Sequence, residues 1–222
     1  MTEWTGSRLT SWQTSFNFDA GRVEKIKQNN KIENIEKERG KYMAKKVLII
    51  STSLRNRSNS EILAEAFAKG AAEAGNQVEF VSLRGKGIRF CTGCLACQKT
   101  QKCVIRDDAP EIVEKMKEAE VIVFASPIYY YEMSGQMKML LDRANPLFSS
   151  DYRFRDIYFL MTAAEEEPET IERAVSGLKG WIACFEKAHL AGTVFGGGAN
   201  KPGEIEGHPA VAEAYEMGKS VS

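Results

Sequence analysis

The stretch VLIISTSLRNRSNS, residues 47–60, joins a short apolar run to a loop rich in hydroxyl groups. Its apolar start, residues 47–51, is typical of a strand buried on both faces of a sheet. A helix pattern follows over residues 58–75, in which Leu63 and Phe67 share one face and Gly75 is the C-terminal stop. A strand, a polar loop and a helix in this order indicate the first unit of an α/β domain.

The same alternation continues along the chain. Apolar runs predict further strands over 77–83, 121–127, 156–164 and 190–198, and periodic patterns predict helices over 109–120, 134–144, 168–188 and 209–221. Five such strand and helix pairs predict a parallel sheet, covered on both faces and wound right-handed. Ligands of such sheets bind beyond the carboxyl ends of the strands, so the loops of interest are 51–60 and 126–134.

The first of these loops is dense in hydrogen-bond donors. It holds five hydroxyl side chains together with Arg55 and Asn59, and neither a Walker loop nor a GxGxxG fingerprint. Hydroxyls, backbone N–H groups at a helix N-terminus and a guanidinium are the partners that a phosphate needs. A helix N-cap explains Ser58 or Ser60 alone, but it does not explain the whole set.

The run Thr52, Ser53, Leu54, Arg55 and then Ser58-Asn59-Ser60 resembles the loop GSPRxxSNT of NAD(P)H-dependent FMN reductases, with Thr and Leu where that family prefers Gly and Pro. The resemblance implies a flavodoxin-like three-layer sandwich with five parallel strands in the order 2-1-3-4-5, and bound FMN. The residues that it assigns to the cofactor are Ser51, Ser53, Arg55, Ser58, Asn59, Ser60, Pro127, Ile128, Tyr129 and Tyr130.

The second loop, SPIYYYEM, strengthens the resemblance, because these reductases carry a similar Pro-x-Tyr segment. Pro127 makes the turn rigid, and the resemblance implies that Ile128 and Tyr129 lie against the flavin ring. Tyr130 and Tyr131 would then line the open face where a nicotinamide stacks. The alternative for three adjacent tyrosines is packing under a partner subunit.

Four of the five cysteines fall in CTGCLACQKTQKC, residues 91–103. The spacing leaves three alternatives open, which are an iron-sulfur cluster, free or redox-active thiols, and zinc. With Asp107 and Asp108 the stretch resembles the compact cysteine motif of iron-sulfur flavoproteins, which implies a [4Fe-4S] cluster on Cys91, Cys94, Cys97 and Cys103. The fifth cysteine, Cys184, lies in a helix pattern and is expected to be a buried structural thiol.

The charge composition bears on which classes of partner the protein can bind. Thirty basic and thirty acidic side chains give a net charge of zero, which argues against nucleic acid and acidic membranes as partners. The sequence has no run of about 18 apolar residues and no signal-peptide core, so we expect a cytoplasmic protein. Clustered cysteines in a reducing compartment favour metal or redox chemistry over disulfides.

Residues 1–42 are polar and lack a strand pattern, whereas the α/β pattern begins directly after Met43. We hypothesise that they are a disordered or loosely helical leader that is not native, and that the FMN-binding domain is 43–222. The alternative is a genuine arm that makes dimer contacts.

The resemblance implies an FMN-dependent oxidoreductase that accepts hydride from NAD(P)H. The flavin would carry the chemistry, so no catalytic side chain is expected, and the electrons would pass to a quinone, a free flavin, another small acceptor or a redox protein. The alternatives are an iron-sulfur and flavin electron carrier reduced by ferredoxin, and a thiol-based redox sensor. We expect a homodimer or homotetramer.

Overall fold

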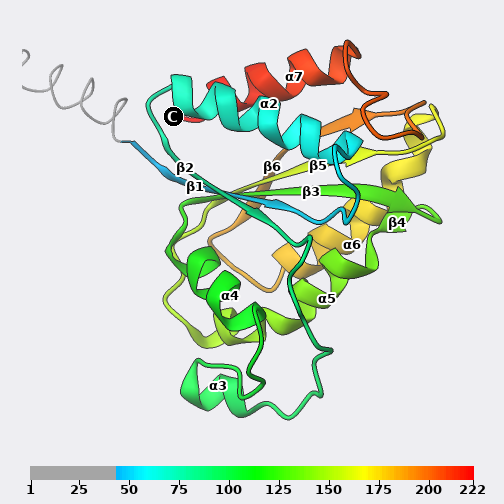
Figure 1. Ribbon diagram of the computed structural model, residues 1–222. Coiled ribbons are helices and arrows are strands. Elements are labelled where there is room, and N and C mark those ends of the chain that lie inside the picture. Colours follow the sequence, from blue (N-terminus) through cyan, green and yellow to red (C-terminus); the bar gives the residue numbers. More distant parts are fainter. Residues whose placement is uncertain (1–43) are drawn as a thin grey trace, which may run out of the picture. The chain divides into compact units, whose positions relative to one another are not determined.

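Parallel strands form the centre of the computed structural model, which describes residues 44–222 (Figure 1). The order β2-β1-β3-β5-β6 confirms the predicted order, because β5 and β6 are the expected fourth and fifth strands. All neighbouring pairs on this path are parallel. The strands are β1 (Lys46–Ser51), β2 (Gln77–Ser82), β3 (Val121–Tyr129), β5 (Asp156–Thr162) and β6 (His189–Gly196).

A sixth strand was not predicted from the sequence. β4 (Glu132–Met133) pairs antiparallel with the end of β3, so that Ile128 lies opposite Met133 and Tyr129 opposite Glu132. β3 therefore continues two residues beyond the predicted end at 127. The result is a short hairpin beyond the carboxyl edge of the sheet.

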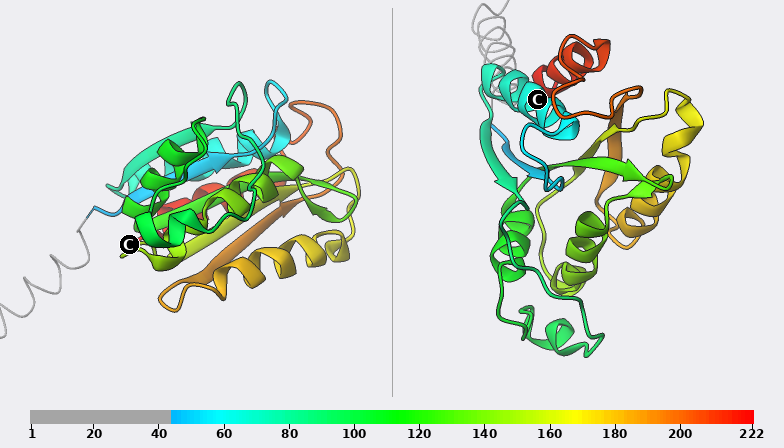
Figure 2. Two further views of the ribbon diagram at one scale, coloured as in Figure 1. Left: turned by 90° about the horizontal axis from the view of Figure 1, so that it is seen from below. Right: turned by 45° about the vertical axis from the view of Figure 1, so that its right-hand side comes forward.

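Helices cover both faces of the sheet (Figures 1 and 2). Along β1, Val47 and Ile49 belong to the core shared with α2 and α7, whereas Leu48 and Ile50 belong to the core shared with α4, α5 and α6. This alternation explains the continuous apolar run at the start of the domain, because both faces of the strand are buried. The helices are α2 (Asn59–Glu73), α3 (Ala96–Thr100), α4 (Ala109–Glu118), α5 (Gly135–Arg143), α6 (Glu172–Ile182) and α7 (Pro209–Lys219).

Two short 3-10 helices complete the described elements, η1 (Asn145–Ser149) and η2 (Pro168–Ile171). The helix predicted over 168–188 is thus η2 followed by α6, which ends at Ile182. Cys184 lies beyond this end and is exposed, so the expectation of a buried thiol is wrong. Ile182 and Phe185 are the buried residues of this segment, and Cys184 points away from the core that they contact.

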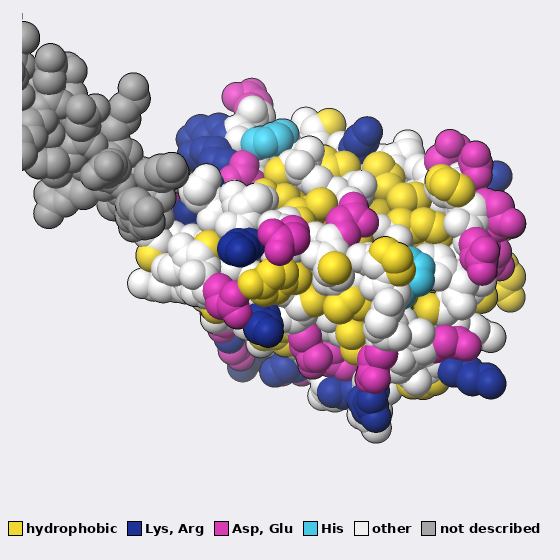
Figure 3. All heavy atoms as spheres, turned by 90° about the horizontal axis from the view of Figure 1, so that it is seen from above, with side chains coloured by type: hydrophobic (Ala, Val, Ile, Leu, Met, Phe, Trp, Pro, Cys, Tyr) yellow, Lys and Arg dark blue, Asp and Glu magenta, His cyan; other side chains and the backbone are white. Residues whose placement is uncertain are grey.

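The hypothesis that residues 1–42 are a leader lies outside the described residues. Within 44–222, every helix is too short or too polar to span a bilayer. On the face formed by α2 and α7, basic, acidic and hydrophobic side chains are interspersed, so this face presents no continuous basic field (Figure 3).

Candidate functional site

A cavity of about 440 Å³ opens beyond the carboxyl ends of β1, β3, β5 and β6. Its volume is in the range of small-molecule and cofactor sites. Both loops singled out in the sequence contribute to it. Nine of the ten residues expected to bind FMN line the cavity, namely Ser53, Arg55, Ser58, Asn59, Ser60, Pro127, Ile128, Tyr129 and Tyr130.

The loop after β1 surrounds the N-terminus of α2 with buried hydroxyl groups. Ser58 is the N-cap of this helix, and its Oγ accepts a hydrogen bond from the Glu61 N–H at 3.2 Å. Ser60 is fully buried and its Oγ has no hydrogen-bond partner, although the residue lines the cavity. Burying an unpaired hydroxyl is costly, so Ser60 provides a donor that a ligand at the helix N-terminus would satisfy.

Asn59 and Arg55, two more of the expected ligands, bind protein groups across the cavity rim. The Asn59 amide donates to the carbonyl oxygens of Ala199 and Lys201 at 3.0 and 2.9 Å, and its Oδ1 accepts from the Ile205 N–H at 3.3 Å. Arg55 Nη1 donates to the Asn200 carbonyl at 2.9 Å. Asn59 therefore holds the loop after β6 in place, while Arg55 keeps its remaining donors available at the exposed rim.

The tenth expected residue, Ser51, lies inside the fold. It is fully buried, does not line the cavity, and its Oγ has no partner. The adjacent Thr52 hydroxyl donates to the Ala125 carbonyl at 3.0 Å and lies 2.9 Å from the Ser134 hydroxyl. Thr52 thus joins the loop after β1 to the N-terminus of α5.

The hairpin between β3 and β4 forms another wall. Ile128 is buried, whereas Tyr129 and Tyr130 are 45% and 97% exposed. Tyr130 and Tyr131 both have positive φ angles, 52° and 65°, which are unfavourable for residues with a side chain. The Tyr131 ring is held under Arg173, with 5.9 Å between the ring centroid and Cζ. The hairpin therefore fixes aromatic surface at the mouth of the cavity.

The remaining wall comes from the loops after β5 and β6. The glycines after β6 indicate a close approach of the backbone to a ligand or a neighbour, whereas the loop after β5 was not predicted to contribute. The Ala199 N–H donates to the Ala163 carbonyl at 2.9 Å, and the Gly198 N–H to the Glu165 carbonyl at 3.1 Å. A Cβ on Gly197 would lie 2.7 Å from the Glu165 carbonyl oxygen, so this close approach requires glycine. The additional lining residues are Tyr131, Thr162, Ala163, Ala164, Glu165, Thr170, Ala199, Asn200 and Pro202.

Neither histidine lines this cavity. His208 caps α7, where its Nδ1 accepts from the Ala210 N–H at 3.1 Å, and His189 lies at the start of β6. The described part of the cavity wall thus offers hydroxyls, side-chain amides, backbone groups, aromatic rings, the Arg55 guanidinium and the Glu165 carboxylate. This set suits binding and orientation of a ligand better than histidine-based proton transfer.

The cysteine loop, residues 88–106, extends away from the body of the domain and carries α3 at its far end (Figures 1 and 2). Its four thiols are separate in the described structure, in which no three side chains of His, Cys, Asp or Glu converge on a metal position. Cys91 and Cys94 are exposed, whereas Cys97 is buried and its Sγ accepts from the Asn145 amide at 3.1 Å. The donor types suit a [4Fe-4S] cluster, but this arrangement of the loop does not.

Cys94 differs from the other thiols in its surroundings. Hydrogen bonds from the backbone of Ala96 and from the Thr92 side chain lower the pKa of its thiol below the usual value. A lower thiol pKa raises the thiolate fraction at neutral pH, and exposure makes that thiolate accessible. Cys94 is therefore the thiol in this loop best suited to react with an oxidant.

Comparison with known sequences relates the chain to flavin enzymes. A family profile described as NADPH-dependent FMN reductase matches residues 45–200. An iron-sulfur flavoprotein of Methanocaldococcus jannaschii is 44% identical over 102 residues, which are 46% of this chain and 53% of that protein. One from Methanosarcina thermophila is 27% identical over 173 residues, 78% of this chain and 87% of that protein.

Solved structures agree on the fold. An NAD(P)H:quinone oxidoreductase from Methanothermobacter marburgensis matches with a TM-score of 0.60 at 16% identity, over 81% of this chain and 100% of that one. This likeness confirms the flavodoxin-like architecture. The chain spans about half the length of the first curated relatives that it matches, between 46% and 56%.

Proposed function

The chain belongs to the family of NADPH-dependent FMN reductases, and from this we propose that it is an FMN-dependent oxidoreductase. It accepts hydride from NADPH or NADH and passes the electrons to a small acceptor such as a quinone or a free flavin, or to a redox protein. The cavity beyond the carboxyl edge of the sheet is the proposed FMN site.

The observation that carries this proposal is the unpaired hydroxyl of Ser60 at the N-terminus of α2. A phosphate placed there would satisfy this buried donor and the helix N–H groups, and Arg55 would balance its charge from the rim. Ile128 and Tyr129 provide the apolar surface for the flavin ring on the opposite wall. The chain therefore offers a polar end and an apolar end within one cavity, as FMN requires.

FMN bound in this cavity would supply the hydride chemistry. The protein groups bind and orient. The loops after β5 and β6 close one side of the cavity against water, and the exposed Tyr130 offers a ring on which a nicotinamide can stack. We assign no acid or base role to a side chain of the protein.

Anaerobic stopped-flow mixing of the flavin-loaded protein with NADPH or NADH tests the proposal. We expect rapid bleaching of the flavin absorbance with at least one nucleotide, followed by reoxidation on adding a quinone. Absence of bleaching with both nucleotides, together with bleaching by reduced ferredoxin, would contradict the enzyme proposal and support an electron carrier.

A second candidate is a redox function of the cysteine loop. The exposed, acidified thiol of Cys94 favours a thiol sensor, and the names of the archaeal relatives favour an iron-sulfur cluster. Anaerobic purification followed by iron and sulfide analysis separates the two. About four iron atoms per chain support the [4Fe-4S] cluster on Cys91, Cys94, Cys97 and Cys103, and flavin without iron supports free thiols.

The assembly and the location of the protein are also proposals. The exposed rings of Tyr129, Tyr130 and Tyr131 suit a homodimer or homotetramer in which a partner subunit covers the cavity. All five cysteines are free, which suits the reducing cytoplasm. Sedimentation analysis of the full chain measures the assembly.

A further inference from the structure

The hairpin of β3 and β4 is closed at its base by a side chain. Ile128 lies opposite Met133, so the next pair toward the base of the hairpin is Pro127 and Ser134. In a hairpin with a two-residue turn, this pair would exchange two backbone hydrogen bonds. Pro127 has no N–H group, so one of these two bonds cannot form.

The Ser126 hydroxyl joins the two opposite backbone groups instead. Its Oγ accepts a hydrogen bond from the Ser134 N–H at 2.9 Å and donates to the Pro127 carbonyl at 2.8 Å. Ser126 is fully buried. Because its hydroxyl donates once and accepts once, neither backbone group at the base of the hairpin is left unpaired.

A second buried hydroxyl joins this base to the loop after β1. Thr52 donates its backbone N–H and its hydroxyl to the Ala125 carbonyl, at 2.9 and 3.0 Å. The Thr52 hydroxyl proton is thereby used, so the 2.9 Å contact between the Thr52 and Ser134 oxygens is a hydrogen bond that Ser134 donates. Ser134 Oγ accepts in turn from the Met137 N–H at 3.3 Å, as the N-cap of α5.

The three hydroxyls form a network with every group paired. Thr52, Ser126 and Ser134 are fully buried, and each hydroxyl both donates and accepts. Such a network is rigid, because another arrangement would leave a buried donor or acceptor unpaired. The N-cap of α5 explains Ser134 alone. It does not explain Thr52, which stands where the FMN reductase loop prefers glycine.

The segments that the network joins form two walls of the cavity. Ser53 and Arg55 belong to the loop after β1 at the polar end, and Ile128 and Tyr129 belong to the hairpin at the apolar wall. The turn of the hairpin, residues 130 and 131, has positive φ angles of 52° and 65°. A strained turn of this kind persists only where the surrounding structure holds it, and the network provides that support at the base of the hairpin.

We propose that Thr52, Ser126 and Ser134 are positioning residues that hold the polar end and the apolar wall of the cavity at a fixed separation, so that the phosphate and the ring of FMN are recognised together. None of the three lines the cavity, so they act through the residues that do. The inference rests on the proposed FMN site. A ligand that contacts both walls gains from their fixed separation, whereas a ligand that contacts only one wall does not.

Binding of FMN and of riboflavin to the flavin-free, full-length protein tests the proposal, since riboflavin has the same ring and ribityl chain without the phosphate. Thr52→Val keeps a similar shape and removes the hydroxyl that links the two walls. We expect it to weaken FMN binding about tenfold and riboflavin binding by no more than about twofold, both measured by flavin fluorescence. Thr52→Ser keeps the hydroxyl and should bind both flavins as the wild type does.

Hydrogen exchange read by mass spectrometry follows the hairpin without any ligand. Ser126→Ala removes the bridge at the base of the hairpin, so it should lower the exchange protection of residues 128–134 and weaken binding of both flavins. The control is Ile112→Val in α4, a buried residue outside the cavity, which lowers stability by the loss of one methylene. It should keep the protection of 128–134 and the wild-type affinity for FMN.

Three results would overturn the proposal. They are wild-type FMN affinity in Thr52→Val, equal weakening of FMN and riboflavin by this variant, and unchanged exchange over 128–134 in Ser126→Ala. If Thr52→Val does not fold, Thr52→Ala gives the same comparison. A wild type that binds neither flavin would instead contradict the proposed FMN site itself.

Discussion

Ser58 and Ser60 are both buried and stand two residues apart at the start of α2, yet the Ser58 hydroxyl is bonded to the protein and the Ser60 hydroxyl is not. Ser58 caps α2, so its contribution belongs to the stability of the fold. Ser60 contributes nothing visible to the fold and lines the cavity. Within the same serine-rich motif, Ser58 therefore has a structural role, and Ser60 is the candidate for ligand binding.

Ser58→Ala should lower the free energy of unfolding by about 1 kcal/mol, the usual value of a helix N-cap. Ser60→Ala should leave the stability of the flavin-free protein unchanged or slightly raised, because it removes an unpaired buried oxygen. It should weaken FMN binding about tenfold, the equivalent of one charge-assisted hydrogen bond. Urea unfolding and FMN fluorescence titration measure the two quantities, and equal effects of both variants on FMN affinity would contradict the assignment.

Tyr130→Gly removes a fully exposed ring from a left-handed backbone position. Relief of the backbone strain, less the added freedom of glycine in the unfolded chain, should stabilise the protein by about 0.5–1 kcal/mol. Loss of the stacking surface should raise the KM for NADPH or NADH about threefold to tenfold.

Tyr130→Phe, which keeps both the ring and the strain, is the control and should retain the wild-type KM. If Tyr130 instead packs under a partner subunit, Tyr130→Gly lowers the mass of the assembly in sedimentation and leaves the KM of the remaining assembly unchanged.

Gly218→Ala should destabilise the packing of α7 on α2. A Cβ at this position would lie 2.1 Å from the Phe67 carbonyl oxygen, which is fixed in α2. We expect a loss of about 1–3 kcal/mol in urea unfolding, as for other overpacked sites. The control is Gly180→Ala in α6, where an added Cβ meets nothing within 4 Å, and a neutral or stabilising change is expected. Similar losses in both variants would contradict the packing argument.

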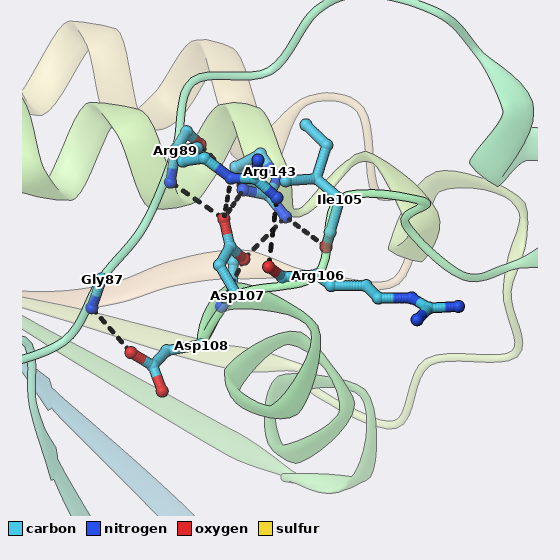
Figure 4. A network of polar contacts seen from close by, with 8 residues as sticks. Gly87, Arg89, Ile105, Arg106, Asp107, Asp108 and Arg143 are labelled. Carbon is cyan, nitrogen blue, oxygen red and sulfur yellow. Dashed lines mark hydrogen bonds and ion pairs between the residues drawn. The ribbon is translucent and has the colours of Figure 1, made fainter.

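Acid should weaken the buried ion pair between Asp107 and Arg143, which lies where the two ends of the cysteine loop meet (Figure 4). Burial opposes ionisation of this carboxyl, but hydrogen bonds from Arg143 and from the backbone N–H groups of Arg89 and Ala109 outweigh it and lower its pKa to about 2. A carboxyl with a lowered pKa in the folded state stabilises the protein above its ordinary pKa of 3.8, and this contribution is lost as the pH falls from about 4 toward 2.

Between pH 5 and pH 3 the wild type should therefore lose about 1 kcal/mol more stability than Asp107→Asn. Urea unfolding at several pH values measures this difference. Asp142→Asn, which removes an exposed carboxylate paired with Lys138, should show the full wild-type loss. Parallel pH dependence of the wild type and Asp107→Asn would contradict the lowered pKa.

The sequence was sufficient for the central strands β1, β3 and β5, because both of their faces are largely buried and their apolar runs are continuous, as in Val47 to Ile50. It was also sufficient for α2, whose N-cap Ser58 and stop Gly75, with a φ angle of 90°, lie where the pattern indicated. These features are local, so neighbouring residues in the chain determine them.

The features that were missed depend on contacts between distant segments. The turn at Tyr130 and Tyr131 lacks the glycine or asparagine that usually signals such a hairpin. The wall at Glu165 depends on the approach of Gly197 from another strand. The cysteine spacing indicates that four thiols share a loop, but their positions depend on partners such as Asn145, 48 residues from Cys97.

The nine residues of α5 join two anchored ends. The hydroxyl of its N-cap Ser134 is hydrogen-bonded to the Thr52 hydroxyl in the loop after β1. In its last turn, the Arg143 guanidinium donates to the Asp107 carboxylate. Each residue of an α-helix turns the chain by about 100°, so inserting or deleting a single residue in α5 would point Arg143 away from Asp107. The length of α5 is therefore fixed by the contacts at its two ends.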